Sequence, residues 1–219
     1  VTGSFERAVV EAGRVLAIRG RLLPSTLDNV NLVADLRRAA PSGLFRVQGE
    51  SSIPKAGQPI DRVFLRPDNA RAYPGAVRAI LNADLIVAGP GSLFTSILPN
   101  LLVDGIRQAV ATSTAVKLYV CNVATQAGET DGFDLGDHVS ALQRHLGRNL
   151  FPNVLAGDGS ACACRSLDLE LVAPTYPKNA GYQVVQADLC DPEVPWRHDA
   201  ARLADEIMRF YRKQRTERQ

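Results

Sequence analysis

Asp84-Leu-Ile-Val-Ala-Gly-Pro-Gly-Ser92 is the stretch that decides the fold of this chain. Its apolar run predicts a buried strand, and the glycines predict a tight turn into a helix. Gly89 and Gly91 remove Cβ atoms that would block a bound group, while Pro90 stiffens the turn. Ser92 is expected to cap the new helix, whose first N–H groups lack partners within the helix. Such a helix start favours an anion such as phosphate, although a plain turn without a ligand shares the pattern.

Size, charge and hydropathy limit the classes of protein to which the chain can belong. It has 219 residues, 46% of them hydrophobic, and a formal net charge of +2 at pH 7. A chain of this length buries roughly 70% of its unfolded surface, so we expect a single α/β domain over residues 1–219. The near balance of charge argues against a nucleic-acid partner. No apolar run approaches the roughly 20 residues of a membrane span, which predicts a soluble, cytoplasmic protein.

The four cysteines predict neither a metal site nor disulfides. A zinc site needs paired two-residue gaps with a second pair or histidines at a suitable distance, and this spacing is missing. We expect reduced, mostly buried thiols. The residues are Cys121, Cys162, Cys164 and Cys190.

Helical and apolar segments alternate along the chain. A strand at 84–88, a helical stretch over 93–113 that is interrupted at Pro99 and Gly105, and a strand at 117–121 predict a βαβ unit with parallel strands. The alternation predicts an open, mostly parallel α/β sheet with helices on both faces. The other expected elements are helices over 2–10, 76–81, 137–147 and 199–212, and strands over 15–19, 30–36, 44–50, 60–66, 153–156, 167–172 and 183–189.

Two polar segments leave the carboxyl ends of the two central strands. One is the glycine turn, and the other is the loop over residues 121–132. In this second loop Asn122, Thr125 and Gln126 offer amide and hydroxyl groups that can bind ribose hydroxyls or base edges. Because ligands of open parallel sheets lie beyond these strand ends, both segments should reach one crevice. The residues therefore predict a site for a phosphate-bearing, nucleotide-like ligand.

Other polar residues are open to a functional or a purely structural interpretation. Glu129 and Asp131 could hold a divalent cation or a hydroxyl, or could be loop carboxylates that face water. Glu50 closes a strand and could present a carboxylate at the same rim, or could be an ordinary turn residue. Ser96 lies on the same helix face as Ser92 and could help to bind an anion.

The remaining candidates lie next to predicted helices. Asp137 and His138 suggest an acid–base pair, but adjacent helical residues point to different faces, so we expect a capping Asp137 and a structural His138. Arg197 has the planar fork that suits a pyrophosphate, and Asp199 is expected to cap the last helix. No catalytic triad and no metal-ligand spacing stands out, so we assign no catalytic residue.

Residues 83–103, which continue the opening stretch as Leu93-Phe-Thr-Ser-Ile-Leu-Pro-Asn-Leu-Leu-Val103, resemble a known signature. It is that of the gluconeogenesis-factor family, the YvcK-type branch of the CofD-like (2-phospho-L-lactate transferase) superfamily. The resemblance implies a Rossmann-like, cytoplasmic bacterial protein that binds UDP-sugars, UDP-N-acetylglucosamine in particular. It also implies a role in gluconeogenic growth, cell shape and cell-wall synthesis. Supporting segments are Leu22-Leu-Pro-Ser-Thr26, Gly49-Glu50, residues 121–133, Asp137-His138-Val139 and Arg197-His198-Asp199.

The resemblance assigns roles by position. It implies that the glycine turn faces the phosphates or the sugar, that the second loop lines the cleft, and that Arg197 closes the site from the final helix. The family opens with a strand and a glycine-rich loop that residues 1–219 lack. We therefore expect an N-terminally truncated CofD-like domain with part of the site and reduced ligand affinity. The implied ligand-binding residues are Gly89, Pro90, Gly91, Ser92, Ser96, Asn122, Thr125, Gln126 and Arg197.

Two functions are compatible with these residues. The first is a nucleotide-sugar-binding regulator, without a cofactor, that signals to an unidentified cell-wall regulatory protein. The alternative is the sister branch's reaction, in which a phospholactyl group passes from a guanosine diphosphate carrier to a deazaflavin alcohol with Mg²⁺. The sister branch typically reads Gly-Pro-Ser-Asn-Pro where this chain has Gly89-Pro-Gly-Ser-Leu93, which favours the regulator. The sequence does not decide whether the protein forms a homo-oligomer. A nicotinamide dehydrogenase is disfavoured, because no G-x-G-x-x-G motif opens a helix here.

Overall fold

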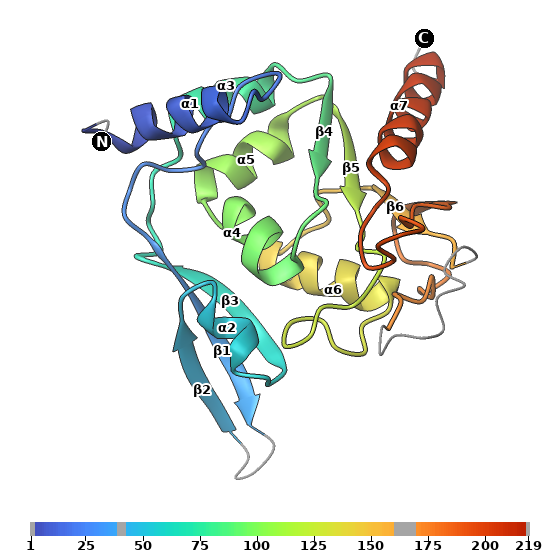
Figure 1. Cartoon of the computed structure of the whole chain (residues 1–219), viewed down its shortest axis with the longest axis horizontal. Coiled ribbons are helices and arrows are strands. Elements are labelled where there is room, and N and C mark those ends of the chain that lie inside the picture. The colour runs from blue at the N-terminus through green and yellow to red at the C-terminus, as the bar shows by residue number, and fades with distance from the viewer. Residues whose placement is uncertain (1–2, 39–42, 160–169, 218–219) are drawn as a thin grey trace.

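The computed structural model describes residues 3–38, 43–159 and 170–217, which fold into two sheets surrounded by helices (Figure 1). The strands are β1 (Asn31–Arg38), β2 (Gly43–Gln48), β3 (Ile60–Arg66), β4 (Leu85–Ala88), β5 (Val116–Val120), β6 (Asn153–Gly157) and β7 (Gln183–Ala187). The helices are α1 (Phe5–Val15), α2 (Ser52–Lys55), α3 (Pro74–Leu81), the π-helical turn η1 (Leu93–Ile97), α4 (Leu98–Leu101), α5 (Asp104–Thr112), α6 (Leu135–Leu146) and α7 (Ala200–Glu217).

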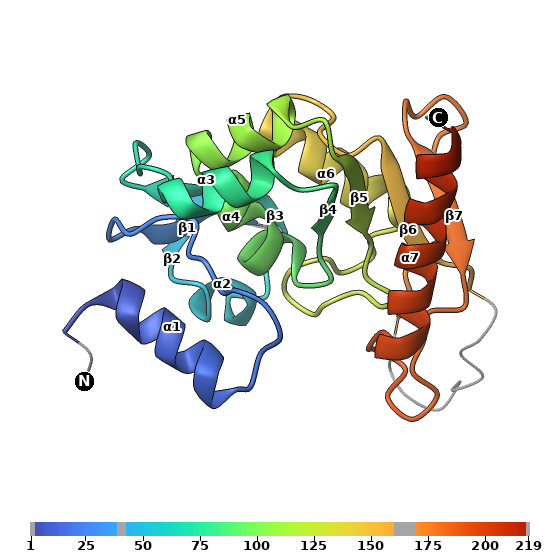
Figure 2. The same cartoon turned by 90° about the horizontal axis from the view of Figure 1, so that it is seen from above.

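A parallel sheet in the order β4-β5-β6-β7 forms the centre of the fold. β4 and β5 pair in parallel across the connection made by η1, α4 and α5, as the βαβ pattern predicts. Successive side chains point to opposite faces, so Ile86 and Tyr119 pack against α3 to α6, whereas Leu118 and Val120 pack against α7. Figure 2 shows α7 on one side of this sheet and α6 on the other. The predicted α/β fold with helices on both faces is confirmed.

A second, antiparallel sheet has the order β2-β1-β3. The patterns at 30–36, 44–50 and 60–66 predict its strands but give no sign that they form a sheet of their own. Asp35, at the centre of β1, lies opposite Arg46 of β2 and Arg62 of β3. The Nε atoms of Arg46 and Arg62 donate to the buried Asp35 carboxylate at 2.8 and 2.9 Å, which lowers the pKa of Asp35. One buried charge therefore ties the strands together.

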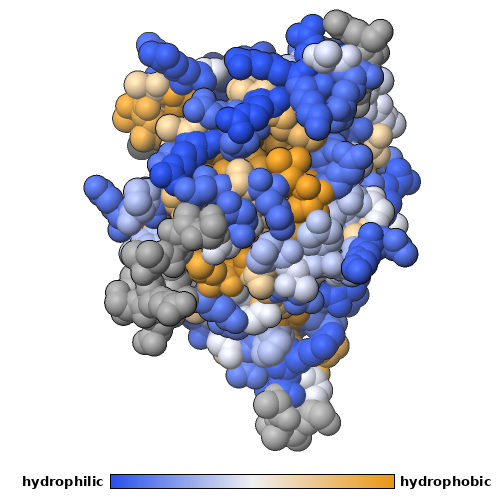
Figure 3. All heavy atoms as spheres, turned by 90° about the vertical axis from the view of Figure 1, so that its right-hand side faces the viewer, coloured by the Kyte–Doolittle hydropathy of each residue, from blue (hydrophilic) through white to orange (hydrophobic). Residues whose placement is uncertain are grey.

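The two sheets share one buried core. Leu36 of β1 and Leu98 of α4 belong to the same cluster of buried side chains. His145 of α6 adds a direct link, because its Nδ1–H donates to the Ala141 carbonyl at 2.7 Å while its Nε2 accepts the N–H of Val63 at 2.9 Å. The face of the molecule that carries α7 is largely hydrophilic, with hydrophobic residues gathered near its middle (Figure 3).

The strand predicted at 15–19 is wrong, because α1 continues to Val15 and then ends in a Schellman turn. The Ile18 N–H donates to the Gly13 carbonyl at 3.0 Å and closes this turn. Ala17 takes the left-handed conformation that glycine usually supplies, with a φ of +50°. These apolar residues have no strand to join, and Val15 is 83% exposed.

Other predicted boundaries also change. Of the strand predicted at 167–172, residues 167–169 lie outside the described ranges. Residues 170–172 form no strand and contribute one isolated bridge, between Leu171 and Ala124. The helical stretch at 93–113 is divided into η1, α4 and α5, so the predicted interruption occurs, close to Pro99 and Gly105. The short helix α2 follows the turn after β2 and has no counterpart among the predicted elements.

Cys121 is buried and Cys190 is half-buried, whereas Cys162 and Cys164 lie outside the described ranges. Burial raises the pKa of the Cys121 thiol to about 12.

Across residues 3–38, 43–159 and 170–217, no helix combines the length and the apolar character needed to cross a membrane.

Candidate functional site

The glycine turn after β4 is shaped by its contact with β5. Gly89 has a φ of +99°, in the left-handed region. A Cβ atom there would lie 2.9 Å from the Val120 carbonyl oxygen and 3.3 Å from Ile97 Cδ1. A Cβ atom at Gly91 would meet the Cβ of Ser96 at 3.3 Å. Because atoms of the protein itself explain both glycines, the turn alone does not indicate a ligand.

The helix start behind the turn faces a carboxylate of the protein. Ser92 takes the N-cap position, but its side chain makes no capping bond, contrary to the prediction. Its hydroxyl instead accepts a hydrogen bond from Gln126 Nε2 at 2.9 Å. Thr95 Oγ1 donates to Glu129 Oε1 at 2.8 Å, while Glu129 Oε2 is buried without a partner among the described residues. The Glu129 carboxylate therefore lies beside the first turn of this helix, bonded to the Thr95 side chain.

A cleft of about 520 Å³ lies where the glycine turn meets the loop after β5. This is the edge of a parallel sheet, beyond the strands' carboxyl ends, at which ligands usually bind. Gly89 does not border this cleft but lines the adjoining apolar cavity. The structure brings the other predicted residues together at the cleft, and their binding of a ligand stays a prediction. They are Pro90, Gly91, Ser92, Ser96, Asn122, Thr125, Gln126 and Arg197.

A chain of hydrogen bonds runs along the floor of the cleft. Asn122 Nδ2 donates to Gln126 Oε1 at 3.0 Å, and Gln126 Nε2 donates in turn to Ser92 Oγ. Since the Ser92 hydroxyl accepts this bond, its own O–H can still donate to a ligand. Asn122 is 9% exposed, and its Oδ1 is buried without a partner among the described residues. The floor therefore offers the Ser92 hydroxyl as a donor, and Asn122 adds a buried carbonyl whose hydrogen-bonding capacity is unused.

A third segment, residues 190–199, completes the rim. Arg197 lies in this loop and not on the final helix, which corrects the position that the resemblance implies. His198 Nε2–H donates to the Cys121 carbonyl at 3.1 Å and so joins the loop to the end of β5. Asp199 caps α7 as predicted, because its Oδ1 accepts the N–H groups of Ala201 and Arg202.

The carboxylates proposed as alternatives lie away from the cleft. Glu129 is buried, which raises its pKa, and the negative charge of exposed Glu50 adds to this effect. Asp131 is exposed and accepts the N–H of Gly128 at 2.7 Å. Glu129 and Asp131 border a different hollow of about 430 Å³. Among the residues that the structure describes, no group of three His, Cys, Asp or Glu side chains could hold a metal ion.

His138 is a core residue and does not border the cleft. Its Nδ1–H donates to the Asp134 carbonyl at 2.8 Å, and its ring meets Phe133 edge-on, with centroids 5.5 Å apart. Burial lowers the pKa of His138. The prediction that Asp137 caps this helix is wrong, because Asp134 is the N-cap and Asp137 completes its capping box from the third helical position.

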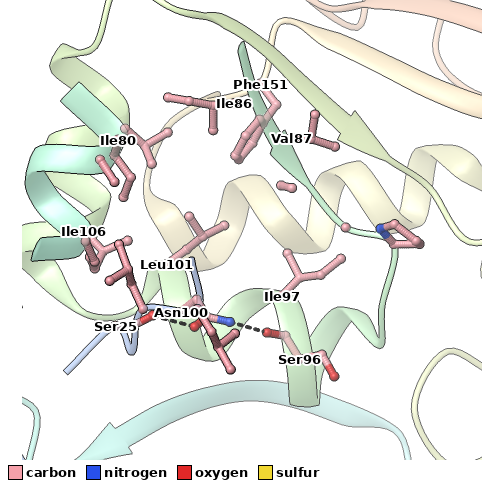
Figure 4. Close-up of a pocket in the computed structure, with 18 of the residues that line it drawn as sticks. Ser25, Ile80, Ile86, Val87, Ser96, Ile97, Asn100, Leu101, Ile106 and Phe151 are labelled. Carbon is pink, nitrogen blue, oxygen red and sulfur yellow. Dashed lines mark hydrogen bonds between the residues drawn. The ribbon is translucent and has the colours of Figure 1, made fainter. Parts of the chain in front are cut away.

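An apolar cavity of about 590 Å³ adjoins the cleft (Figure 4). It lies between β4 and the helices α3, α4 and α5, and Ile86, Leu101 and Phe151 line its walls. At one end Asn100 Nδ2 donates to the Ser96 carbonyl at 2.7 Å. The cavity meets the cleft at Pro90 and Ser96, which border both.

Comparison with known proteins identifies the family. A family model described as 2-phospho-L-lactate transferase CofD matches residues 1–215. The chain belongs to the CofD family. Over 155 residues it is 46% identical to the gluconeogenesis factor of Halalkalibacterium halodurans and 45% identical to that of Bacillus subtilis. Each match covers 71% of this chain and 47% of the relative, so the chain spans about half the length of the curated relatives it matches.

A solved structure agrees with this assignment. The crystal structure of a UPF0052 family member from Bacillus halodurans superposes with a TM-score of 0.79 at 36% identity. The match covers 94% of this chain and 68% of that chain. The predicted resemblance of this CofD-family chain to the gluconeogenesis factors is therefore confirmed.

Trp196 is the residue at the cleft of this CofD-family chain that sequence reasoning missed. It borders the cleft and is 51% exposed. It is the chain's one tryptophan and directly precedes Arg197. A single tryptophan beside a predicted binding arginine was the available signal.

Proposed function

We propose that the protein is a cytoplasmic regulator that binds a nucleotide sugar such as UDP-N-acetylglucosamine and links gluconeogenic growth to cell-wall synthesis and cell shape. The cleft between the glycine turn and the loop after β5 supports this proposal most directly. The names of the Bacillus subtilis and Halalkalibacterium relatives, both gluconeogenesis factors, support the metabolic role.

The polar groups of the cleft match the parts of such a ligand. The hydroxyls of Ser92 and Ser96 and the guanidinium of exposed Arg197 can donate to a diphosphate. The buried acceptor Asn122 Oδ1 suits a hydroxyl or an amide N–H, as a sugar or a base carries. A site that combines hydroxyl, amide and guanidinium groups fits a molecule that carries both phosphates and hydroxyls.

The alternative function is the phospholactyl transfer that the description of the family model names. That reaction would use Mg²⁺, which takes octahedral oxygen ligands. Glu129 already accepts from Thr95, and Asp131 accepts from the Gly128 N–H. These carboxylates do not form a shared magnesium site, so we derive no reaction step through a metal ion.

Calorimetry tests the proposed function. UDP-N-acetylglucosamine is titrated into the full-length protein up to millimolar concentration, and saturable heat is expected. The absence of heat from a well-folded sample would contradict the proposal. Turnover of a guanosine diphospholactate donor would establish the transferase in its place.

A charge variant tests the position of the diphosphate in the same titration. Ser92→Asp should weaken binding at least about tenfold, because it sets a carboxylate against the phosphates. Ser140→Asp, on the exposed surface of α6, is the charge-matched control and should bind as the parent does. Equal affinity of Ser92→Asp and Ser140→Asp would remove Ser92 from the site.

A further inference from the structure

Trp196 stands at the rim of the cleft with half of its surface open. It borders the same cleft as Ser92 and Asn122 and is 51% exposed. Within residues 3–38, 43–159 and 170–217, no aromatic ring and no guanidinium stacks on its indole. The flat apolar face of the indole is therefore available to a ligand in the cleft.

The backbone beneath Trp196 is held in place before any ligand arrives. The Asp191 side chain accepts the N–H groups of Glu193 and Val194 at 2.8 and 3.1 Å. The N–H of Asp191 donates to the Arg197 carbonyl at 3.0 Å and closes the loop across Trp196. Together with the bond from His198 to β5, these contacts fix the position of the rim against the floor. Such preorganisation reduces the entropy lost on binding.

The floor and the rim of the cleft differ in chemistry. The floor carries amides and hydroxyls, including the buried Asn122 Oδ1 that lacks a partner among the described residues. The rim carries an indole and, next to it, the guanidinium of Arg197. In a nucleotide sugar the hydroxyls and phosphates match the floor and the guanidinium. The base is the one flat, aromatic part of the ligand and matches the indole.

We infer that Trp196 is the stacking platform for the base of the nucleotide, with the diphosphate beside Arg197 and the sugar toward Asn122. This inference rests on the proposed function and deepens it, because it names which end of the ligand each side of the cleft recognises. Every base has a π face, so the platform supplies affinity for a nucleotide without selecting one base. The ligand class is a nucleoside diphosphate sugar, and a sugar phosphate alone lacks the part that Trp196 binds.

Three ligands and two substitutions test the platform by calorimetry on the full-length protein. The ligands are UDP-N-acetylglucosamine, UMP and N-acetylglucosamine 1-phosphate, and the variants are Trp196→Leu and Trp196→Phe. Trp196→Leu should weaken the binding of both uridine ligands by about 5- to 150-fold, the usual effect of losing a base–aromatic stack. It should leave the sugar phosphate unaffected, and Trp196→Phe should keep most of the affinity because it keeps an aromatic ring.

The outcomes separate this inference from the proposed function. If the parent protein binds none of the three ligands, the proposed function fails and the platform fails with it. If the parent binds UDP-N-acetylglucosamine and Trp196→Leu binds it equally well, or loses affinity for all three ligands alike, the platform alone is refuted. Fluorescence gives a second readout. Subtracting the emission of Trp196→Phe from that of the parent leaves the emission of Trp196, which UMP should quench and the sugar phosphate should not. Unquenched emission with bound UMP also refutes the platform.

Discussion

Gly128 lies closer to the backbone of α2 than a side chain would allow. A Cβ atom there would fall 2.1 Å from the Pro54 carbonyl oxygen, and the residue has a φ of +77°. Gly132 has a φ of +70° but nothing within 4 Å of a Cβ. Gly132→Ala should therefore cost about 1–2 kcal/mol of unfolding free energy, for the left-handed backbone alone. Gly128→Ala should cost at least about 3 kcal/mol, because it adds a clash with backbone atoms.

Urea unfolding of both alanine variants measures this difference. The glycines share a backbone conformation, so Gly132→Ala is the control for strain. Equal losses at the two positions would show that the loop after β5 is not seated on α2. The larger loss at Gly128 should come with weaker ligand binding, since the same loop carries Asn122 and Gln126.

At the scale of residues, chain order predicts which side chains gather at the cleft, but not their hydrogen-bond partners. Asn122 and Ser92 follow adjacent parallel strands, so their meeting follows from the topology alone. The partners come from residues 34 positions away, where Gln126 bonds Ser92 and Glu129 bonds Thr95. No local pattern around the glycine turn contains this information, and the predicted serine cap is wrong for that reason.

Among the elements, α6 and β3 are joined through the neutral imidazole of His145. The ring donates to Ala141 and accepts from Val63, so a second proton on the ring would remove the acceptor. Burial lowers the pKa of His145 below its usual 6.5. Below that pH the unfolded chain binds more protons than the folded one, so the free energy of unfolding should fall as the pH drops from 6.5 toward the folded pKa.

Urea unfolding at about pH 7.5 and about pH 5.5 checks this link. His145→Asn should lose about 1–3 kcal/mol at the higher pH, because the Val63 N–H loses its acceptor. It should also lose less additional stability at the lower pH than the parent. A slope should remain, because burial also lowers the pKa of His138 and of half-buried His198. An identical pH dependence in the parent and in the variant would show that His145 does not link the two elements electrostatically.

Hydrophobic patterns predict most elements but not every boundary or partner. β5, β6 and α6 carry mostly buried apolar residues, so their patterns are strong. The end of α1 is invisible in the sequence because Ala17, and not a glycine, takes the left-handed position. The separate sheet of β1 to β3 is equally hidden, since alternation marks a strand and not the sheet that it joins.

At the scale of the molecule, the cleft depends on the whole parallel sheet. Its borders come from the end of β4, the end of β5 and the loop before α7. α7 packs on one face of the sheet, and the helices that contact the antiparallel sheet pack on the other. The site is therefore built by elements that contribute to the buried clusters on both faces of the parallel sheet.

One buried cluster spans both sheets, which predicts that they unfold together. Leu36 of β1 is fully buried in the cluster that also holds Tyr119 of β5. Leu36→Ala should cost about 2–5 kcal/mol by leaving a cavity. The unfolding midpoint followed by far-ultraviolet circular dichroism and the one followed by Trp196 fluorescence should fall together. This is expected even though Trp196 lies at the cleft and not in the antiparallel sheet. Leu203→Ala, under α7, is the matched control and should also move both. A Trp196 midpoint that stays at the parent value in Leu36→Ala would show that the sheets unfold independently.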